Sequence, residues 1–429
     1  MKGKKGVKMR EFAEINRASV DDYLDVCFSA YKGMGRVDEK RTEYLRNNVL
    51  ADIDDAYDSR FFGLYEKSQM IAAMKIVDLS MNIFGKLQQA TGLMSMAIRP
   101  EFVNGEVVSQ MISYFESFVK DSDSNIALLF PGSVEVSKKY GYGNGTRMEE
   151  YNIPIQDLPA ADDISKLRFL TKEDLWNTLK YHENFARHNH TALMKCIQEI
   201  RDMQNDADIL RISYVDNGHI RGYISYKFVV DEEGQCLSRH IAVDEMVYES
   251  RDILKFLLGY LKIYAKDADH VTLDTEEENF TELLNIKEDA DAPRELIVSD
   301  MRGVMGKVLS PMKFVAHTKY RKLPLANIIV EIEISDEMAG MDKAMKLRFS
   351  EDRVNGCSRW SVAQADVTAD VKLQCTGAAA TSLMLGTVRL PSLIRSGQAK
   401  ISDSQYTLLL DKLFYSGDEC DAEPEQLNS

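Results

Sequence analysis

The chain has 429 residues, of which 45% are apolar and 28% are charged, and its formal net charge is −15. This length exceeds one ordinary hydrophobic core and predicts two or three domains, because a domain usually holds about 100 to 200 residues. The negative charge argues against a nucleic-acid partner, whose phosphates would be repelled, and is compatible with a cationic small molecule as substrate.

The sequence also argues against a membrane or secreted protein. No stretch reaches the roughly 20 apolar residues of a membrane-spanning helix, and the basic start MKGKKGVKMR is followed by no apolar segment of a signal peptide. The cysteines stand singly, with spacings of neither a disulfide framework nor a zinc site. They are Cys27, Cys196, Cys236, Cys357, Cys375 and Cys420. We therefore expect a cytoplasmic protein without a metal site.

The first part of the chain alternates strand-like and helix-like patterns, with apolar residues at spacings of two or of three to four. The predicted order is β-α-α-β-β-β-α-β-α-β. These elements cover residues 10–15, 19–31, 39–50, 60–66, 69–85, 86–99, 106–119, 125–130, 134–141 and 147–155. This order predicts a mixed α/β module.

A similar order begins again after a linker over residues 156–167. The elements cover residues 167–170, 172–186, 191–204, 208–215, 220–230, 238–248, 250–265 and 270–275. We interpret them as a diverged structural repeat of the first module. The segment that corresponds to its strand-turn-helix, DEMVYESRDILKFL, contains no glycine, so we expect no bound phosphate there.

The character of the sequence changes again near residue 298. A short helix is predicted over residues 299–309, hairpin strands over 327–337 and 343–352, and a strand running into a helix over 371–386. In that last segment GAAATSLMLG supplies small residues that allow close helix packing. Two more helical patterns follow, and the acidic end of the chain is typical of a solvated tail.

One strand-turn-helix carries the main functional question. The strand-like run Met94–Ile98 meets a Pro-Glu turn, and a helical pattern starts after VNGE. Such an arrangement presents backbone N–H groups to a phosphate. Glu106, however, places a carboxylate where an anion would sit.

Three stretches resemble the GNAT N-acetyltransferases, namely GLMSMAIRPEF, FPGSVEVSKKYGYGN and LLLDKLF. The whole layout resembles the Eis (enhanced intracellular survival) branch of that family. The resemblance implies an α/β fold with mixed sheets. A GNAT module over residues 1–155 would be followed by a degenerate one over 156–297, a domain like sterol carrier protein 2 over 298–415 and a tail over 416–429. It also implies a homo-oligomer.

The resemblance implies acetyl transfer from acetyl-CoA to the amine of a small molecule or a lysine. Acetyl-CoA would lie along the end of the strand, with its pyrophosphate over the start of the following helix. The implied binding residues are Met96, Ala97, Ile98, Asn104, Gly105, Val107 and Val108. A tyrosine would protonate the leaving thiolate, and the C-terminal carboxylate, here that of Ser429, would take the proton of the amine.

Three parts of the family mechanism depart from its pattern: the turn, the general acid, and the chain end, which is the polar PEQLNS where the family tends to have an aromatic residue. In the turn Pro-Glu-x-Arg/Gln-x-x-Gly-x-Gly/Ala, the three variable positions are Val103, Glu106 and Val108. A shift of one residue would give Gly105 the role of the glycine but would put Phe102 at the basic position, so the basic contact is missing in either register. The general-acid position is Ser137, whose hydroxyl is a far weaker acid than a phenol. Tyr140 and Tyr142, nearby, are expected to be core or turn aromatics.

These departures leave two classes of function open. The first is an Eis-like N-acetyltransferase whose chemistry is impaired or altered. The second is a non-catalytic ligand-binding or scaffold protein on the same fold. A lipid carrier acting through the last domain is a third reading. The histidines of ARHNH, with His182 upstream, lack the convergent acids or thiols of a metal site.

Overall fold

The computed structural model describes residues 10–31, 39–55, 57–130, 132–146, 148–160, 164–205, 208–233, 236–264, 267–275, 277, 279–285, 297–299, 303–336 and 343–416. They form two compact units. The first unit comprises the described residues before 146, residues 196–198 and those from 305 onward. The second unit comprises the described residues of 146–195 and 199–304.

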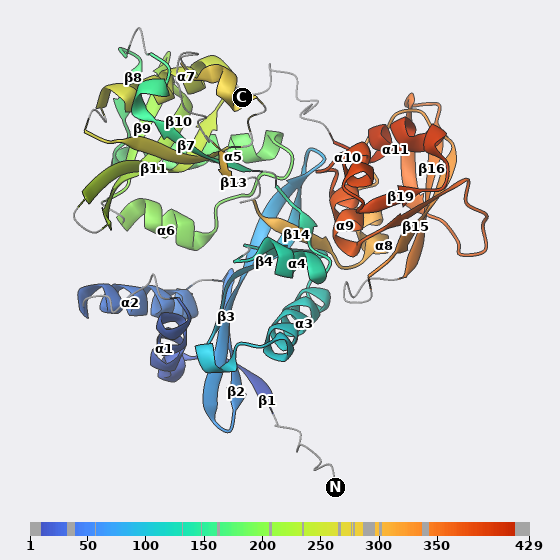
Figure 1. The fold of residues 1–429 in the computed structure, drawn as a ribbon, viewed down its shortest axis with the longest axis horizontal. Coiled ribbons are helices and arrows are strands. Elements are labelled where there is room, and N and C mark those ends of the chain that lie inside the picture. Colours follow the sequence, from blue (N-terminus) through green and yellow to red (C-terminus); the bar gives the residue numbers. More distant parts are fainter. Residues whose placement is uncertain are drawn as a thin grey trace. The chain divides into compact units, whose positions relative to one another are not determined.

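A mixed sheet of seven strands is the centre of the N-terminal part of the first unit (Figure 1). In spatial order the strands are β1 (Arg10–Glu14), β2 (Ser59–Glu66), β3 (Gln69–Ile83), β4 (Lys86–Ile98), β5 (Ile126–Leu129), β14 (Met305–Val308) and β6 (Gly143–Asn144). The helices around this sheet are α1 (Val20–Ala30), α2 (Glu39–Asp55), α3 (Gly105–Asp121) and α4 (Val134–Lys139).

Helix α3 follows the residue spacing that its sequence predicts. Val107, Met111, Phe115 and Val119 recur every fourth position and are completely buried. They join one apolar cluster with residues of β2, β3 and β4, while α1 contributes to a second cluster with residues such as Phe61. The sheet is therefore covered by helices with separate cores.

A second mixed sheet of seven strands organises the second unit. Its spatial order is β13 (Ile297–Ser299), β7 (Glu149–Pro154), β12 (His270–Thr275), β11 (Cys236–Tyr248), β10 (His219–Glu233), β9 (Leu210–Asp216) and β8 (Leu167–Phe169). The accompanying helices are α5 (Leu175–His188), α6 (Ile197–Asn205) and α7 (Arg251–Tyr264). In each sheet two long neighbouring strands run antiparallel, and the second of them pairs in parallel with a further strand. In the first sheet β4 follows β3 and pairs with β5, and in the second β11 follows β10 and pairs with β12.

The C-terminal part of the first unit has its own sheet of five strands. Its order is β17 (Cys357–Val362), β16 (Ala344–Asp352), β15 (Ile328–Ile334), β18 (Val371–Cys375) and β19 (Ala399–Ile401). The helices are α8 (Pro311–His317), α9 (Gly377–Leu385), α10 (Leu390–Arg395) and α11 (Thr407–Phe414).

Helix α9 packs closely against the N-terminal module, as its small residues predict. All of its residues are buried. The hydroxyl of Thr381 donates to the carbonyl oxygen of Gly141 (3.0 Å), and that of Ser382 accepts from the amide of Asn144 (2.9 Å). A Cβ atom at Gly143 would lie 2.2 Å from the carbonyl oxygen of Ala378. Only a glycine permits this approach of strand and helix.

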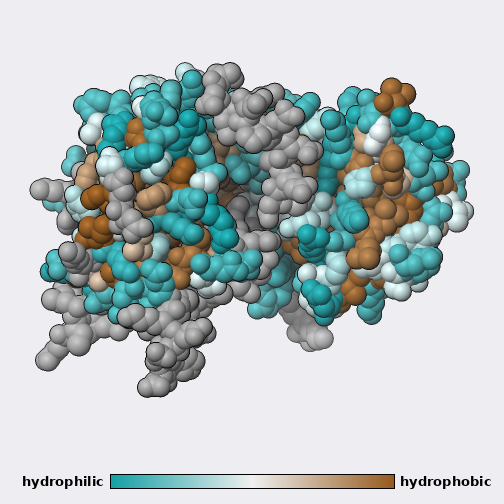
Figure 2. Space-filling view, turned by 90° about the horizontal axis from the view of Figure 1, so that it is seen from above, coloured by the Kyte–Doolittle hydropathy of each residue, from teal (hydrophilic) through white to brown (hydrophobic). Residues whose placement is uncertain are grey.

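Apolar side chains also remain exposed on the C-terminal part, among them Leu325, Val362 and Leu408. Figure 2 shows hydrophobic residues gathered along one side of this part, at the right of the view. Scattered exposed apolar residues are ordinary, whereas a contiguous group marks a surface that contacts other molecules. None of the helices in the described ranges is long and apolar enough to cross a membrane.

The predicted plan of mixed α/β sheets with two similar modules in tandem is confirmed, but three local expectations are wrong. The strand expected near residues 147–155 pairs with β12 and β13 in the second sheet. The short helix expected over 299–309 is replaced by β14, which pairs with β5 and β6. Helix α6 starts at Ile197 rather than Thr191, whose φ of 64° is incompatible with a right-handed helix.

Candidate active site

The last residues of β4 have an open backbone edge. Strands β4 and β5 run parallel and pair only from Ala90 with Ile126 to Leu93 with Leu129. Strand β5 ends at Leu129, whereas β4 continues to Ile98. The two strands therefore separate, and beyond Leu93 the backbone of β4 pairs on this side with no strand of the described chain.

A β-bulge precedes the open edge. Opposite β4, Lys75 pairs with Ser95 and Ile76 pairs with Leu93, so that Met94 is an extra residue on β4. A bulge bends its strand and re-aims the residues that follow. The bulge at Met94 therefore contributes to the separation of β4 from β5.

Successive residues of β4 direct their backbone N–H and C=O groups alternately toward β3 and toward the open edge. The amide of Arg99 donates to the carbonyl oxygen of Ile71 (2.9 Å). Because bonded and non-bonded pairs alternate along antiparallel strands, the backbone of Ala97 also points to β3. Met96 and Ile98 direct their N–H and C=O groups the other way. Of the three strand residues predicted to contact the cofactor, only Met96 and Ile98 offer backbone groups to the open edge.

The N-terminus of α3 lies directly after this strand and is capped by Asn104. The Asn104 side chain accepts from the amide of Val107 (3.1 Å), and its carbonyl accepts from the amide of Val108 (3.1 Å). The cap leaves the amides of Gly105 and Glu106 unused at the positive end of the helix dipole. The side chains of Val107 and Val108 pack in the core, so only backbone groups here can meet an anion.

The carboxylate of Glu106 is bound by a basic residue that the turn motif does not contain. Arg10, on β1, reaches Glu106 at 3.1 Å and the buried Glu66 at 3.0 Å. Its guanidinium also donates to the side-chain oxygen of Gln110 (3.3 Å). Because Arg10 also pairs with Glu66, its single positive charge compensates the carboxylate of Glu106 only in part.

The arginine next to the turn is engaged elsewhere. The guanidinium of Arg99 donates to the carbonyl oxygen of Met70 (2.9 Å) and pairs with Asp25 (2.6 Å). Its side chain is directed back to β3 and α1. Arg99 therefore does not supply the missing phosphate contact in this conformation.

Ser137 is a structural residue in the conformation described. It lies in α4, is buried, and its hydroxyl donates to the carbonyl oxygen of Ser133 (3.0 Å). Its own carbonyl accepts from the amides of Tyr140 and Tyr142 (3.0 and 3.2 Å). This geometry holds the turn after α4 together, and the buried aliphatic hydroxyl is a far weaker acid than a phenol.

Tyr140 and Tyr142 belong to the core, as predicted. Burial raises the pKa of the Tyr142 phenol well above its usual range, and the nearby Glu116 carboxylate raises it further. Lys307, on β14, pairs with Glu116 at 2.6 Å and lies over the Tyr142 ring. These groups stabilise the sheet centre.

The structure reveals a different phenol at the open edge. Tyr31 follows α1, and its hydroxyl donates to the carbonyl oxygen of Met96 at 2.9 Å. Burial raises the pKa of Tyr31, although its side chain stays partly exposed, and the bond to Met96 opposes the rise. Tyr23 and Cys27, on α1, lie behind it, and burial raises the pKa of the Cys27 thiol to about 11. No local motif marks Tyr31, because its contact spans 65 positions.

The second module repeats the backbone of this edge. Opposite β10, Ser225 pairs with Glu245 and Tyr226 with Val243, so that Asp244 is an extra residue, as Met94 is in β4. The amide of Glu249, the residue after β11, donates to the carbonyl oxygen of Arg221 on β10 (3.1 Å), as the amide of Arg99 does to Ile71 on β3. The diverged repeat therefore extends to the bulge and its hydrogen-bond phase.

The side chains at the second edge are different. Glu245 is bound by Lys195 (2.7 Å) and by His182 (3.3 Å), and burial lowers the pKa of His182. Helix α7 begins at Arg251 without an extended turn, and Ser250 caps it by accepting from the amide of Ile253 (3.4 Å). The expectation that no phosphate binds there stays a prediction.

The remaining predicted residue, Ser429, lies outside the described residues. No group of three or more His, Cys, Asp and Glu side chains suited to a metal ion occurs in the part of the chain that the structure describes.

Comparison with known proteins agrees with this geometry. Residues 11–145 match the acetyltransferase (GNAT) domain family, so the chain contains a GNAT acetyltransferase domain. No curated protein matches the chain in sequence.

Solved structures share the fold over nearly the whole chain. A GCN5-related N-acetyltransferase from Anabaena variabilis has a TM-score of 0.73 at 14% identity and covers 96% of this chain and 98% of its own. A probable N-acyltransferase from Enterococcus faecalis reaches 0.72 at 14% identity, with coverages of 95% and 97%. Eis1 from Mycobacterium abscessus reaches 0.68 at 15% identity, with coverages of 96% and 98%.

Proposed function

We propose that this chain is an Eis-like N-acyltransferase that moves an acetyl group from acetyl-CoA to the amine of a small molecule or a lysine. The observation that carries the proposal is the open edge of β4 at Met96 and Ile98, directly before the N-terminus of α3. Backbone groups suit the amides of a pantetheine arm, and helix amides suit a pyrophosphate. Neither contact depends on the side chains that depart from the family pattern.

The reaction needs positioning and one proton donor. The neutral amine attacks the thioester carbonyl, a C–N bond forms, and collapse of the tetrahedral intermediate breaks the C–S bond. The amine releases its extra proton to water, and the departing thiolate takes one from an acid. We assign this acid to Tyr31, because its hydroxyl lies at Met96 and a phenol is protonated at neutral pH. Ser137 is not suited to it, because its buried aliphatic hydroxyl is a far weaker acid than a phenol.

Calorimetric titration with acetyl-CoA tests the proposal. We expect micromolar binding, followed by acetylation of spermine or of an Nα-protected lysine, measured as release of free CoA thiol. Absence of heat and of a thermal shift at millimolar acetyl-CoA would refute it. Binding without any turnover of either amine would favour the second candidate, a non-catalytic ligand-binding or scaffold protein, which the internal bond of Ser137 supports.

We further propose that the C-terminal part, assigned as like sterol carrier protein 2, supports the acetyltransferase module. Its helix α9 binds the segment after α4 through Thr381 and Ser382. Native mass spectrometry of the purified protein tests the alternative of a lipid carrier, which requires a co-purified lipid. We also propose a homo-oligomer, with the exposed apolar surface of this part as a contact. Light scattering coupled to gel filtration measures its mass.

A further inference from the structure

We propose that the second unit contains a binding site for an organic carboxylate with an apolar tail, separate from the acetyl-CoA edge. A cavity of about 460 Å³ lies between the start of α5, the end of α6 and strand β9. Leu170, Leu175, Met203 and Ile209 supply apolar walls. Polar side chains, among them Thr171, Thr178 and Gln204, supply the rest of the lining. Ligand pockets usually hold about 300 to 1,000 Å³, so this cavity suits a small molecule with both a polar and an apolar part.

Arg211 gives the cavity its anchor. Its Nη1 donates to the carbonyl oxygen of Met203 (3.3 Å), whereas its Nε is buried and has no hydrogen-bond partner. No carboxylate of the described residues forms an ion pair with Arg211. The Nε is enclosed and out of reach of a ligand, so the terminal Nη groups are those that a carboxylate in the cavity would contact. The planar guanidinium matches a carboxylate with two parallel hydrogen bonds.

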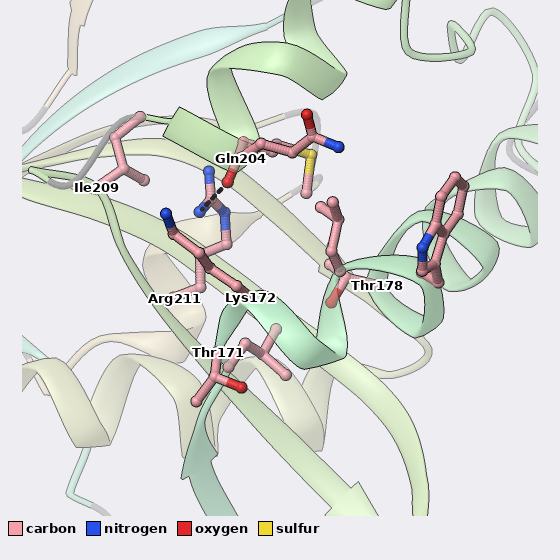
Figure 3. A pocket seen from close by; sticks show the side chains of 10 residues that line it. Thr171, Lys172, Thr178, Gln204, Ile209 and Arg211 are labelled. Atoms are coloured by element: carbon pink, nitrogen blue, oxygen red, sulfur yellow. Dashed lines mark hydrogen bonds between the residues drawn. The ribbon is translucent and has the colours of Figure 1, made fainter.

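Lys172 adds a second positive charge. Its side chain is exposed and forms no ion pair within the described residues. Figure 3 shows Lys172 and Arg211 extending in the same direction along the cavity, with Gln204 and Ile209 around them. The acid Asp174 is bound by Arg168 (2.9 Å), whereas the adjacent Glu173 interacts with the charge of Lys172, so Arg211 is the principal cation of the cavity. The two cations favour an anionic head group over a neutral one.

Trp176 completes the lining and provides a signal. Its side chain is 75% exposed and borders the cavity, so an aliphatic or aromatic tail bound there would cover it. The chain has one other tryptophan, Trp360, which is buried and donates to the carbonyl oxygen of Thr318 (3.3 Å). A change in tryptophan emission on binding can therefore be attributed to Trp176 by substitution.

Titration of the full chain with decanoate, followed by tryptophan fluorescence, tests the proposal. We expect a saturable blue shift that is absent in Trp176→Phe. Arg211→Gln should weaken the affinity at least tenfold, because a charge-assisted pair is lost. Lys172→Gln, at an exposed position that folding tolerates, should weaken it severalfold. Arg187 lies on α5 with Trp176 but does not line the cavity, and it is paired with Glu183. Arg187→Gln should therefore leave the affinity unchanged.

Two further probes separate the contributions of head group and tail. Decanol has the same tail without the charge and should bind at least tenfold more weakly than decanoate. Inorganic phosphate has the charge without the tail and should produce no shift at equal concentration. The carboxylate site would be overturned if decanol bound as tightly as decanoate. It would also be overturned if the Arg211→Gln and Lys172→Gln variants bound decanoate as tightly as wild type. Tighter binding of phosphate than of decanoate would overturn the assignment of the ligand class.

Discussion

The phenol of Tyr31 donates a 2.9 Å hydrogen bond to the backbone carbonyl of Met96, on the edge of β4 that β5 leaves open. The bond places an acidic hydroxyl at the position where the fold directs backbone groups toward a ligand. In the proposed mechanism, this phenol, which follows α1, takes the role that the family pattern gives to a tyrosine in α4.

Replacement of Tyr31 by phenylalanine tests this role. General acid catalysis contributes about 100- to 10,000-fold, so we expect kcat to fall about 100-fold, while the dissociation constant of acetyl-CoA changes less than threefold. Tyr57→Phe, at a side chain that is 90% exposed, is the matched control and should behave as wild type. A fall in acetyl-CoA affinity with unchanged kcat would show that Tyr31 positions the cofactor and donates no proton.

Replacement of Ser137 by alanine should affect stability only. The variant loses the bond from the Ser137 hydroxyl to Ser133, which costs about 1 kcal/mol in the free energy of unfolding. Its kcat should stay within twofold of wild type, because the hydroxyl faces the helix and not a substrate. Urea denaturation and initial rates measure the two quantities. A tenfold loss of kcat would return the catalytic role to Ser137.

The thiol of Cys27 predicts a pH dependence of stability. Burial raises its pKa from the usual 9.0 to about 11, while a bond from Tyr23 opposes the rise. The folded state therefore holds the proton more tightly than the unfolded state. This contribution is complete below pH 9 and is lost as the pH rises toward 11. The free energy of unfolding of wild type should fall by up to about 3 kcal/mol relative to Cys27→Ala across this range. Parallel curves of the two proteins would contradict it.

The ion pair of Arg10 with Glu106 predicts a weak effect of Glu106→Gln on the cofactor. An exposed charge about 4 Å from a phosphate costs about 1 kcal/mol, and Arg10 compensates part of it. We expect acetyl-CoA to bind less than fivefold more tightly, and the gain to vanish in 1 M salt. Glu135→Gln, on the exposed face of α4, is the control. A gain above tenfold would mean that Glu106 points into the phosphate site.

Local sequence patterns predicted the elements but not their long-range partners. Spacing alone located α3, because Val107, Met111 and Phe115 recur at helical intervals. The strand near residue 150 could not be assigned to a sheet, since its alternation suits either module and pairing with β12 decides the matter. The same limit applied to the site, where Arg10 reaches Glu106 across 96 positions. Local patterns can indicate residues within the turn motif but not those that folding brings to it.

Substitutions at two glycines distinguish the proposed cofactor site at the start of α3 from the packing of α9 against β6. A Cβ atom at Gly105 would meet no atom within 4 Å, whereas one at Gly143 would lie 2.2 Å from the carbonyl oxygen of Ala378. Gly143→Ala should therefore destabilise the protein by about 1 to 3 kcal/mol, because α9 must move away from β6. Gly105→Ala should leave the free energy of unfolding within about 0.5 kcal/mol of wild type.

In cofactor binding the order of the two variants should be reversed, because Gly105→Ala should bind acetyl-CoA more weakly and Gly143→Ala should not. If the pyrophosphate lies against the amide of Gly105, a methyl group there blocks its approach, and we expect acetyl-CoA to bind at least tenfold more weakly in calorimetry. Gly143→Ala, measured at a temperature where it is folded, should keep its affinity within threefold, because α9 contacts the segment after α4 and not the edge of β4. Unchanged affinity in Gly105→Ala would place the pyrophosphate away from the first turn of α3 and would leave the open strand edge as the only anchor for the cofactor.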